Sequence, residues 1–248
     1  MHFFVFITGC CIGSFLNVLI YRIPKQIPFW SGRSFCPSCR TTIKPYDLIP
    51  ILSYLFLLGR CRNCRSRISC RYPIIEILTG VIAMLVFENS GFTVLSLIYF
   101  IFSAILIVIA FIDIDTMTIP NGLILSLIIP TAAILFFTEH PDIISRIIGF
   151  FIISVLLYLI NFLIPNGFGG GDIKLIAVCG FMLGWQNVLV AFIIGLIVGG
   201  IHGAILLIKN IKNSHRHIAF GQYLCIGAFI ALLYGKNIIN AYVGLFGL

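Results

Sequence analysis

Long apolar runs are the feature that most restricts how this chain can fold. A helix needs about 20 apolar residues to cross a bilayer, with a range of roughly 17–25. Of the 248 residues 60% are hydrophobic and 10% charged, whereas a soluble domain is about 25% charged. These proportions exclude a cytosolic enzyme, a disordered chain and a secreted disulfide scaffold, and they predict an all-α polytopic membrane protein. About eight transmembrane helices are expected, at residues 3–21, 73–87, 92–112, 123–137, 147–164, 173–185, 188–208 and 218–234.

The distribution of charge predicts the orientation of these spans. Ten of the sixteen Lys and Arg residues lie within residues 22–71, where Asp47 is the only acid. A basic block beside membrane spans is typical of a cytoplasmic loop, and we prefer this reading to a nucleic-acid site. The N-terminus is then outside. The span at 173–185 is short, so that seven spans instead of eight remain open.

The alternation of loops places further charged residues. The connection at 138–146, with Arg146, is expected outside, and the connection after residue 208, with Lys209, Lys212 and Arg216, inside. The same alternation brings three acids to the cytoplasmic membrane surface. These acids are Asp113, Asp115 and Asp172.

Two pairs of cysteines in the basic loop have the spacing of a metal site. Cys36 and Cys39 form one CxxC pair, Cys61 and Cys64 form another, and 21 residues separate the pairs. Four thiolates in this pattern hold structural zinc at tetrahedral geometry. Two disulfides are the alternative, against which a reducing cytoplasmic location argues. Zinc binding would fold a small insertion that has few large apolar residues of its own.

Acids in or against apolar runs are functional candidates, because an ionised side chain in a membrane is costly. Asp113 ends a strongly apolar span. Asp172 follows three glycines and begins the next span. Consecutive glycines resist continuous helix and let another chain come close. If the two carboxylates meet, they would share a proton, and one could activate water while the other donates to a carbonyl oxygen.

Three other interpretations remain open from the residues alone. The acids could be isolated at the membrane surface without a joint role. They could carry protons or cations through a transporter, which also uses intramembrane carboxylates and broken helices. The cysteine loop could instead be the functional part, as in a membrane-anchored zinc-ribbon adaptor that binds a protein partner.

The sequence resembles the prepilin peptidases, the type IV leader peptidases of the GxGD aspartic protease class. The likeness covers nearly the whole chain and rests on several motifs together. In three places the sequence departs from the family pattern, with Leu48 where Asn is usual, Asn121 where many members have Asp, and Gln222 in place of Pro. The motifs are the opening segment at 13–24, the two CxxC pairs, the stretches at 46–54 and 68–76, Ile112–Asp113 with Ile119–Asn121, the GxGD element at 169–172, and the turn at 219–222.

The resemblance implies a two-aspartate protease that removes the basic leader from type IV prepilins or pseudopilins at the cytoplasmic face of the bacterial inner membrane. It implies that Asp113 and Asp172 are the catalytic pair, with Asp115 as the rival to Asp113. An active-site loop with Lys174 would surround Asp172, and Glu76 would have an accessory role in ordering the cysteine domain or contacting the peptide. The glycines of that loop are Gly169, Gly170 and Gly171.

The resemblance also implies a second reaction. Family members with the cysteine domain N-methylate the new terminal residue and use S-adenosylmethionine as the donor, although no glycine-rich cofactor fold is visible in this sequence. The expected domains are a first transmembrane helix at 1–21, a cytoplasmic zinc-binding domain at 22–72 and a transmembrane protease domain at 73–248. The expected partners are the prepilin substrate and membrane lipid, with no nucleic acid.

Overall fold

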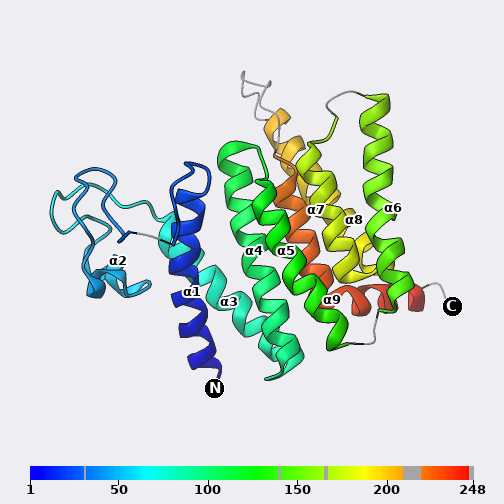
Figure 1. Ribbon diagram of the computed structural model, residues 1–248, viewed down its shortest axis with the longest axis horizontal. Helices are drawn as coiled ribbons and strands as arrows, with labels where there is room; N and C mark the ends of the chain where they lie inside the picture. The colour runs from blue at the N-terminus through cyan, green and yellow to red at the C-terminus, as the bar shows by residue number, and fades with distance from the viewer. Residues whose placement is uncertain (31, 139–140, 165–166, 209–218, 246–248) are drawn as a thin grey trace. The chain divides into compact units, whose positions relative to one another are not determined.

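The computed structural model describes the chain except for residues 31, 139–140, 165–166, 209–218 and 246–248 (Figure 1). Over these described residues the structure is helical, and its β pairing is limited to two isolated bridges. The cations predicted at Lys209, Lys212 and Arg216 lie outside the described residues. The chain divides into two compact units, which we call the N-terminal unit (Met1–Ser96) and the C-terminal unit (Leu97–Leu248).

The N-terminal unit is built on two apolar helices that pack against each other, α1 and α3. Small residues line their contact: a side chain at Gly9 would meet Ala83 and Gly80, and one at Gly13 would come within 2.8 Å of the Glu76 Cα. The segment that joins the two helices carries the cysteines and two short helical turns. The elements are α1 (His2–Arg22), η1 (Pro45–Leu48), α2 (Leu52–Phe56) and α3 (Arg71–Ser90).

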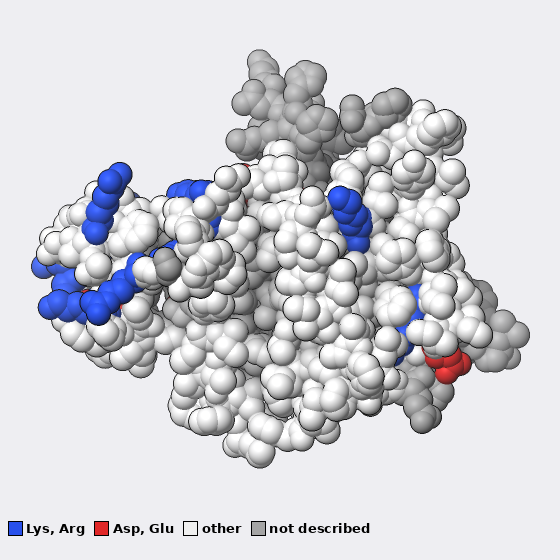
Figure 2. All heavy atoms as spheres, viewed as in Figure 1, with Lys and Arg blue, Asp and Glu red and all other residues white. Residues whose placement is uncertain are grey.

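Polar contacts hold the ends of this joining segment. Arg22, the last residue of α1, is buried, and its guanidinium donates to the carbonyls of Pro28 and Arg33. The buried amide of Asn17 donates to the carbonyl of Tyr72 at 3.1 Å, and this bond ties α1 to the start of α3. Basic side chains gather over the surface of this joining segment (Figure 2).

In the C-terminal unit one short helix is packed among four others. The central helix is α7, which contacts α5, α6, α8 and α9. Most of its residues are buried, which explains why it is apolar on all sides rather than along one stripe. The elements are α4 (Val94–Thr116, whose first residues precede the unit), α5 (Asn121–Ala133), η2 (Ile134–Phe136), α6 (Ile143–Leu163), α7 (Gly170–Leu183), α8 (Trp185–Ile208) and α9 (Gly221–Leu245).

Glycines set two features around α7. Gly184 has a φ of +80° and separates α7 from α8, so that the short span does not run into its neighbour. The backbones of α6 and α7 touch at Gly149 and Gly180, where a side chain on either residue would collide with the other's carbonyl group. These glycines let α7 sit deep among its neighbours.

The predicted all-α polytopic fold is confirmed. Each of the eight predicted spans overlaps a different α-helix over most of its described residues. Six helices in the described residues are long and apolar enough to cross a membrane: α1, α3, α4, α6, α8 and α9. The other two, α5 and α7, are shorter. Many large apolar side chains on these helices are exposed, which suits a lipid environment. The chain is a multi-pass membrane protein.

One residue lies in a different place from the one expected. The sequence assigned Arg146 to a connecting loop, but it lies in the first turn of α6 and its side chain is fully buried. Its guanidinium donates to the carbonyls of Pro141, Phe181 and Met182 and to the Thr138 hydroxyl. The alternation of spans placed Arg146 in an outer connection, whereas the structure buries it, and these acceptors offset the cost of burying the cation.

Candidate functional site

Two buried acids occupy the ends of different helices in the C-terminal unit. Asp113 lies in the last turn of α4 and is 3% exposed, and Asp172 lies in the first turn of α7 and is 8% exposed. Asp115, two residues further along α4, is exposed. The structure therefore separates the two candidates of the Asp-Ile-Asp stretch by burial.

The two buried acids come together beside the start of α9. A Cβ atom built on Gly221 would lie 2.8 Å from Asp113 Oδ2 and 3.0 Å from Asp172 Oδ1. The two oxygens cannot be farther apart than the sum of these distances, so one small molecule between them could touch both. A third contact, Ile119 Cδ1, lies 2.8 Å from the same point and bounds the site with an apolar group.

Backbone N–H groups at two helix starts hold the carboxylates. The N–H of Gln222, in the first turn of α9, donates to Asp113 Oδ2 at 3.1 Å. The N–H of Gly169, the residue before α7, donates to Asp172 Oδ2 at 3.3 Å. The first N–H groups of a helix lack partners within it and carry partial positive charge, so they favour negative charge at these positions.

The glycine segment before Asp172 differs from the expected loop. Gly170 and Gly171 are the first residues of α7, and Gly169 is its cap. The helix begins at Gly170, two residues before Asp172, because the Asp172 carboxylate accepts the N–H of the cap residue Gly169 and so stabilises the first turn. Lys174 is exposed, and its Nζ donates to Asn121 Oδ1 at 3.0 Å.

The first turn of α9 contains site residues to which the sequence assigned no role. Gly221 leaves room between the acids, and Gln222 donates to one of them. The next residue, Tyr223, is buried and its hydroxyl pairs with Nδ1 of His202 on α8 at 2.5 Å. The segment at 219–222 was noted as a motif, but only the fold brings it to the carboxylates.

A second cluster lies in the N-terminal unit. The Sγ atoms of Cys36, Cys39, Cys61 and Cys64 all lie within 4.8 Å of one another. Zn–S bonds of about 2.3 Å at tetrahedral angles place sulfurs about 3.8 Å apart, and Cys36 and Cys64 are separated by 3.8 Å. No disulfide joins cysteines within the part of the chain that the structure describes. The four cysteines can hold a metal ion, and their geometry fits zinc.

The two CxxC pairs adopt the same backbone turn. In each turn the residue after the second cysteine donates its N–H to the carbonyl of the first, from Arg40 to Cys36 at 2.8 Å and from Arg65 to Cys61 at 3.0 Å. Both arginines have positive φ, 56° and 59°. An isolated β-bridge closes each turn. Left-handed backbone at a non-glycine residue is costly, so both turns are held by their surroundings.

Backbone groups of these turns favour thiolate. Hydrogen bonding from the N–H of Cys39, assisted by that of Ser38, lowers the pKa of the Cys36 thiol to about 6, although burial opposes the shift. The hydroxyl and N–H of Ser66 lower the pKa of Cys64. The N–H groups of Cys64 and Asn63 act in the same direction on Cys61, but burial and the Cys36 and Cys64 side chains outweigh them and raise the pKa of that thiol. The contacts therefore favour thiolate, the form that binds a metal, at Cys36 and Cys64.

Glu76 links the inserted segment to α3. It is 7% exposed, and its Oε2 accepts the N–H of Ile51 at 2.8 Å. Ile51 has a φ of 62°, a strained value for a β-branched residue. The predicted accessory residue therefore holds a turn of the cysteine segment, and it lies in a different unit from Asp113 and Asp172.

Comparison with known proteins covers both units. Residues 7–89 match the family model described as the bacterial peptidase A24 N-terminal domain, and residues 100–204 match the type IV leader peptidase family. A protein of Bacillus subtilis (strain 168) named prepilin leader peptidase/N-methyltransferase is 33% identical over 243 residues, which is 96% of each chain. The chain belongs to the type IV leader peptidase family. The resemblance stated from the motifs is thereby confirmed.

Other relatives carry the same name. The Legionella pneumophila protein is 33% identical over 98% of this chain and 95% of its own length. The Pseudomonas aeruginosa protein is 30% identical over 96% of this chain and 91% of its own length. No solved structure matches the chain. The choice of Asp113 and Asp172 as catalytic residues stays a prediction, and so does the three-part division at residues 21 and 72.

Proposed function

We propose that this chain removes the leader peptide from type IV prepilins or pseudopilins and then N-methylates the new terminus. One observation carries the proteolytic part: two buried carboxylates, Asp113 and Asp172, converge on the space beside Gly221. Acids that approach so closely do not both ionise readily. Membership of a protease family supports the same reaction.

In this proposal the two acids divide the chemistry of peptide hydrolysis. The ionised carboxylate accepts a proton from water, which attacks the scissile carbonyl carbon, and the protonated carboxyl donates to the carbonyl oxygen. A proton then passes from a carboxyl group to the leaving nitrogen as the C–N bond breaks. The N–H groups of Gly169 and Gln222 keep both side chains oriented during these transfers.

The substrate and orientation follow from the membrane setting. Prepilin would reach the site within the membrane by its own apolar stem, and the basic block at 22–71 supports a cytoplasmic location for the cysteine segment, with the N-terminus outside. Both acids then lie at the cytoplasmic face of a bacterial inner membrane.

The cysteine cluster has a structural role in this proposal. Cys36, Cys39, Cys61 and Cys64 would hold one zinc ion as four thiolates, and metal binding would stabilise the domain at 22–72. S-adenosylmethionine would be the methyl donor, as the names of the relatives suggest. When bound it supplies an electrophilic methyl group for the new terminal amine.

Single substitutions test the proteolytic assignment. Asp113→Asn and Asp172→Asn should each abolish leader removal, measured as the loss of the shortened product by mass spectrometry, while the proteins still insert into membranes. Asp115→Asn should cleave, which separates the two acids of α4. Glu88→Gln, at an exposed acid of α3, controls for the loss of one charge.

The outcomes distinguish the alternatives. Normal cleavage by both Asp113→Asn and Asp172→Asn would reject the two-aspartate proposal. A transporter would leave prepilin uncut and move ions or solute in liposomes. Methyl transfer is read in the same reaction, because addition of S-adenosylmethionine should increase the product mass by one methyl substitution.

A further inference from the structure

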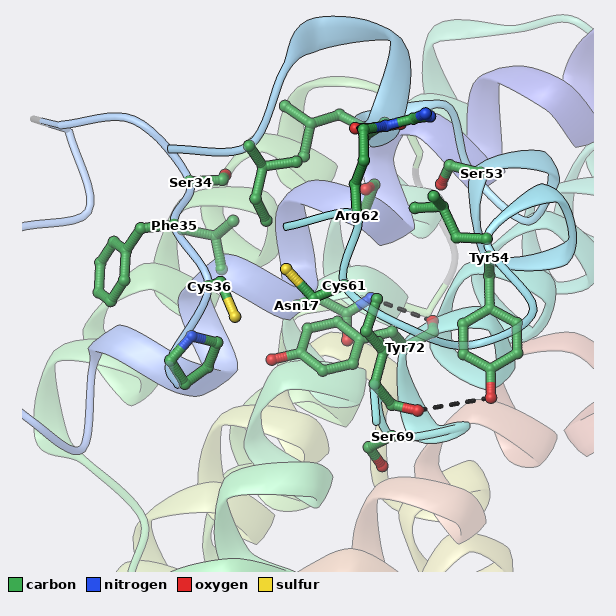
Figure 3. Close-up of a pocket in the computed structure, with 18 of the residues that line it drawn as sticks. Asn17, Ser34, Phe35, Cys36, Ser53, Tyr54, Cys61, Arg62, Ser69 and Tyr72 are labelled. Atoms are coloured by element: carbon green, nitrogen blue, oxygen red, sulfur yellow. Dashed lines mark hydrogen bonds and ion pairs between the residues drawn. The ribbon is translucent and has the colours of Figure 1, made fainter. Parts of the chain in front are cut away.

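The N-terminal unit contains a cavity that the proteolytic proposal does not use. Its volume is about 800 Å³, and α1, α2, α3 and the two cysteine turns line it. In the view of Figure 3, Phe35 and Cys36 lie on one side, Tyr54 on the other, and Asn17 and Tyr72 between them. Binding sites for small organic molecules have volumes of about 300–1,000 Å³, so this cavity is large enough for a nucleoside-sized ligand.

Aromatic rings supply the apolar part of the lining. Tyr21, Phe35, Tyr54 and Tyr72 all contribute to the wall. The hydroxyl of Tyr54 donates to the carbonyl of Ile68, which orients that ring. Aromatic faces stack on planar bases and attract cations, and both properties suit a cationic nucleoside.

Only one of the two acids in the wall is neutralised by a basic partner. Asp47 forms a two-pronged ion pair with Arg62, whose Nη2 lies 2.7 Å from Oδ1 and Nε 2.9 Å from Oδ2. Glu76 is buried, accepts a backbone N–H, and forms no ion pair with a Lys or Arg among the described residues. A buried carboxylate without a counter-ion favours a cationic ligand at that point.

Basic side chains lie elsewhere in the same wall. Lys44 and Arg67 both line the cavity and are exposed. The lining thus carries exposed cations at Lys44 and Arg67 and a buried carboxylate at Glu76. The buried cation Arg22 also lines the cavity, and its guanidinium donates to backbone carbonyls. A ligand with a planar base, a carboxylate, an ammonium and a further, internal cation complements this arrangement.

We infer that this cavity is the methyl-donor site, and that it binds S-adenosylmethionine with the sulfonium centre next to Glu76. The inference rests on the proposed methyl transfer and adds to it a place and a binding residue. The adenine would stack among the tyrosines, and the carboxylate of the donor would face Lys44 and Arg67. The cysteine turns form part of the wall, since Cys36 and Cys61 line the cavity.

Filling the cavity tests its location. Ser53→Trp places an indole on a residue of α2 that lines the cavity, and Leu55→Trp places one on an exposed residue of the same helix that does not. Titration calorimetry of the full chain in detergent should show that Ser53→Trp weakens binding of S-adenosylmethionine at least about tenfold, whereas Leu55→Trp binds as the unmodified protein does. Leader cleavage and zinc content should be kept in both variants, and this verifies that they fold.

Replacing Glu76 tests the charge. Glu76→Gln keeps a carbonyl oxygen for the N–H of Ile51 and removes the negative charge. The demethylated product, S-adenosylhomocysteine, has the same groups but a neutral thioether, so it serves as a matched ligand. The substitution should reduce affinity for S-adenosylmethionine by about tenfold relative to S-adenosylhomocysteine, and should change binding of the neutral ligand little.

Each result has a definite meaning. Unchanged donor binding by Ser53→Trp would overturn the location even if the chain methylates its product. Equal weakening of both ligands by Glu76→Gln, or lost methyl transfer with unchanged affinities, would overturn the sulfonium assignment and point to the substrate amine instead. If the unmodified protein cleaves prepilin but neither binds nor uses the donor, the proposed methyl transfer fails, and the location fails with it.

Discussion

Gly221 shows how a single residue without a side chain can leave space between two buried acids. The point where its Cβ would lie is within 3.0 Å of an oxygen of each buried acid. The residue that follows donates its N–H to Asp113. The same turn therefore leaves room between the two acids and orients one of them.

Gly221→Ala should reduce leader cleavage by about 100-fold, because the methyl group would displace one or both carboxylates and such shifts are costly in reaction rate. The measurement is the initial rate of product formation at saturating prepilin. Gly122→Ala, in the first turn of α5 with open space around it, is the matched control and should keep the normal rate. A fully active Gly221→Ala would show that the acids work with a different spacing.

Replacement of Arg146 should destabilise the protein. Its guanidinium satisfies two carbonyls at the end of α7, so Arg146→Met would leave buried acceptors without donors. The free energy of unfolding in detergent should then fall by about 3 kcal/mol, and the melting temperature should fall by roughly 10 °C. Lys236→Met, at an exposed cation of α9, should change stability by less than about 0.5 kcal/mol. Equal melting temperatures for the two variants would contradict the role assigned to Arg146.

The sequence identified Asp113 and Asp172 as candidates because an acid beside an apolar run is conspicuous in composition alone. It could not place Gly221, Gln222 or Arg146. The first two become site residues through a contact across more than a hundred positions with Asp113. The burial of Arg146 depends on carbonyls of another helix, and no local pattern encodes those acceptors.

At the scale of elements, helix content was predictable and helix environment was not. Each of the eight apolar segments overlaps an α-helix, and six of these helices meet the length and hydropathy of a membrane span. The central place of α7 was not predictable, because it results from contacts with four other helices. The CxxC spacing predicted a metal cluster. The left-handed backbone conformation that Arg40 and Arg65 share could not be predicted, since glycine is the usual residue at positive φ.

The cysteine turns yield a prediction about metal removal. Purified protein should contain about one zinc per chain, and Cys36→Ser combined with Cys61→Ser should lose it because two of four ligands are gone. Donor binding should fall with the zinc, since both cysteines line the cavity, whereas leader cleavage should persist. Elemental analysis and calorimetry measure the two effects. Cys70→Ser, at an exposed cysteine outside the cluster and the cavity lining, is the control and should retain the metal.

At the scale of the whole molecule, the residues of the two proposed reactions lie in separate compact units. The acids, their backbone donors and Gly221 belong to the C-terminal unit, whereas the cysteine cluster, the cavity and Glu76 belong to the N-terminal unit. The basic block and the CxxC pairs indicated a distinct segment in the sequence. The boundary at Ser96 could not be predicted, because it falls within the first turn of a continuous apolar helix, α4.

Hydrogen exchange tests this independence. Chelation of zinc should increase amide exchange across residues 34–70, because the turns lose the ligand that fixes them. Exchange in α7 and in the last turns of α4 should stay unchanged, and these peptides are the internal control. Faster exchange throughout α7 after chelation would show that the C-terminal unit depends on the metal.

The enclosure of α7 has a consequence for how the protein tolerates different membranes. A helix in contact with lipid responds to bilayer thickness by tilting, but α7 is held by α5, α6, α8 and α9 and buries most of its residues. Its height and inclination are therefore set by protein neighbours. Asp172, at the start of this helix, is shielded from changes in acyl-chain length that would reorient the outer helices.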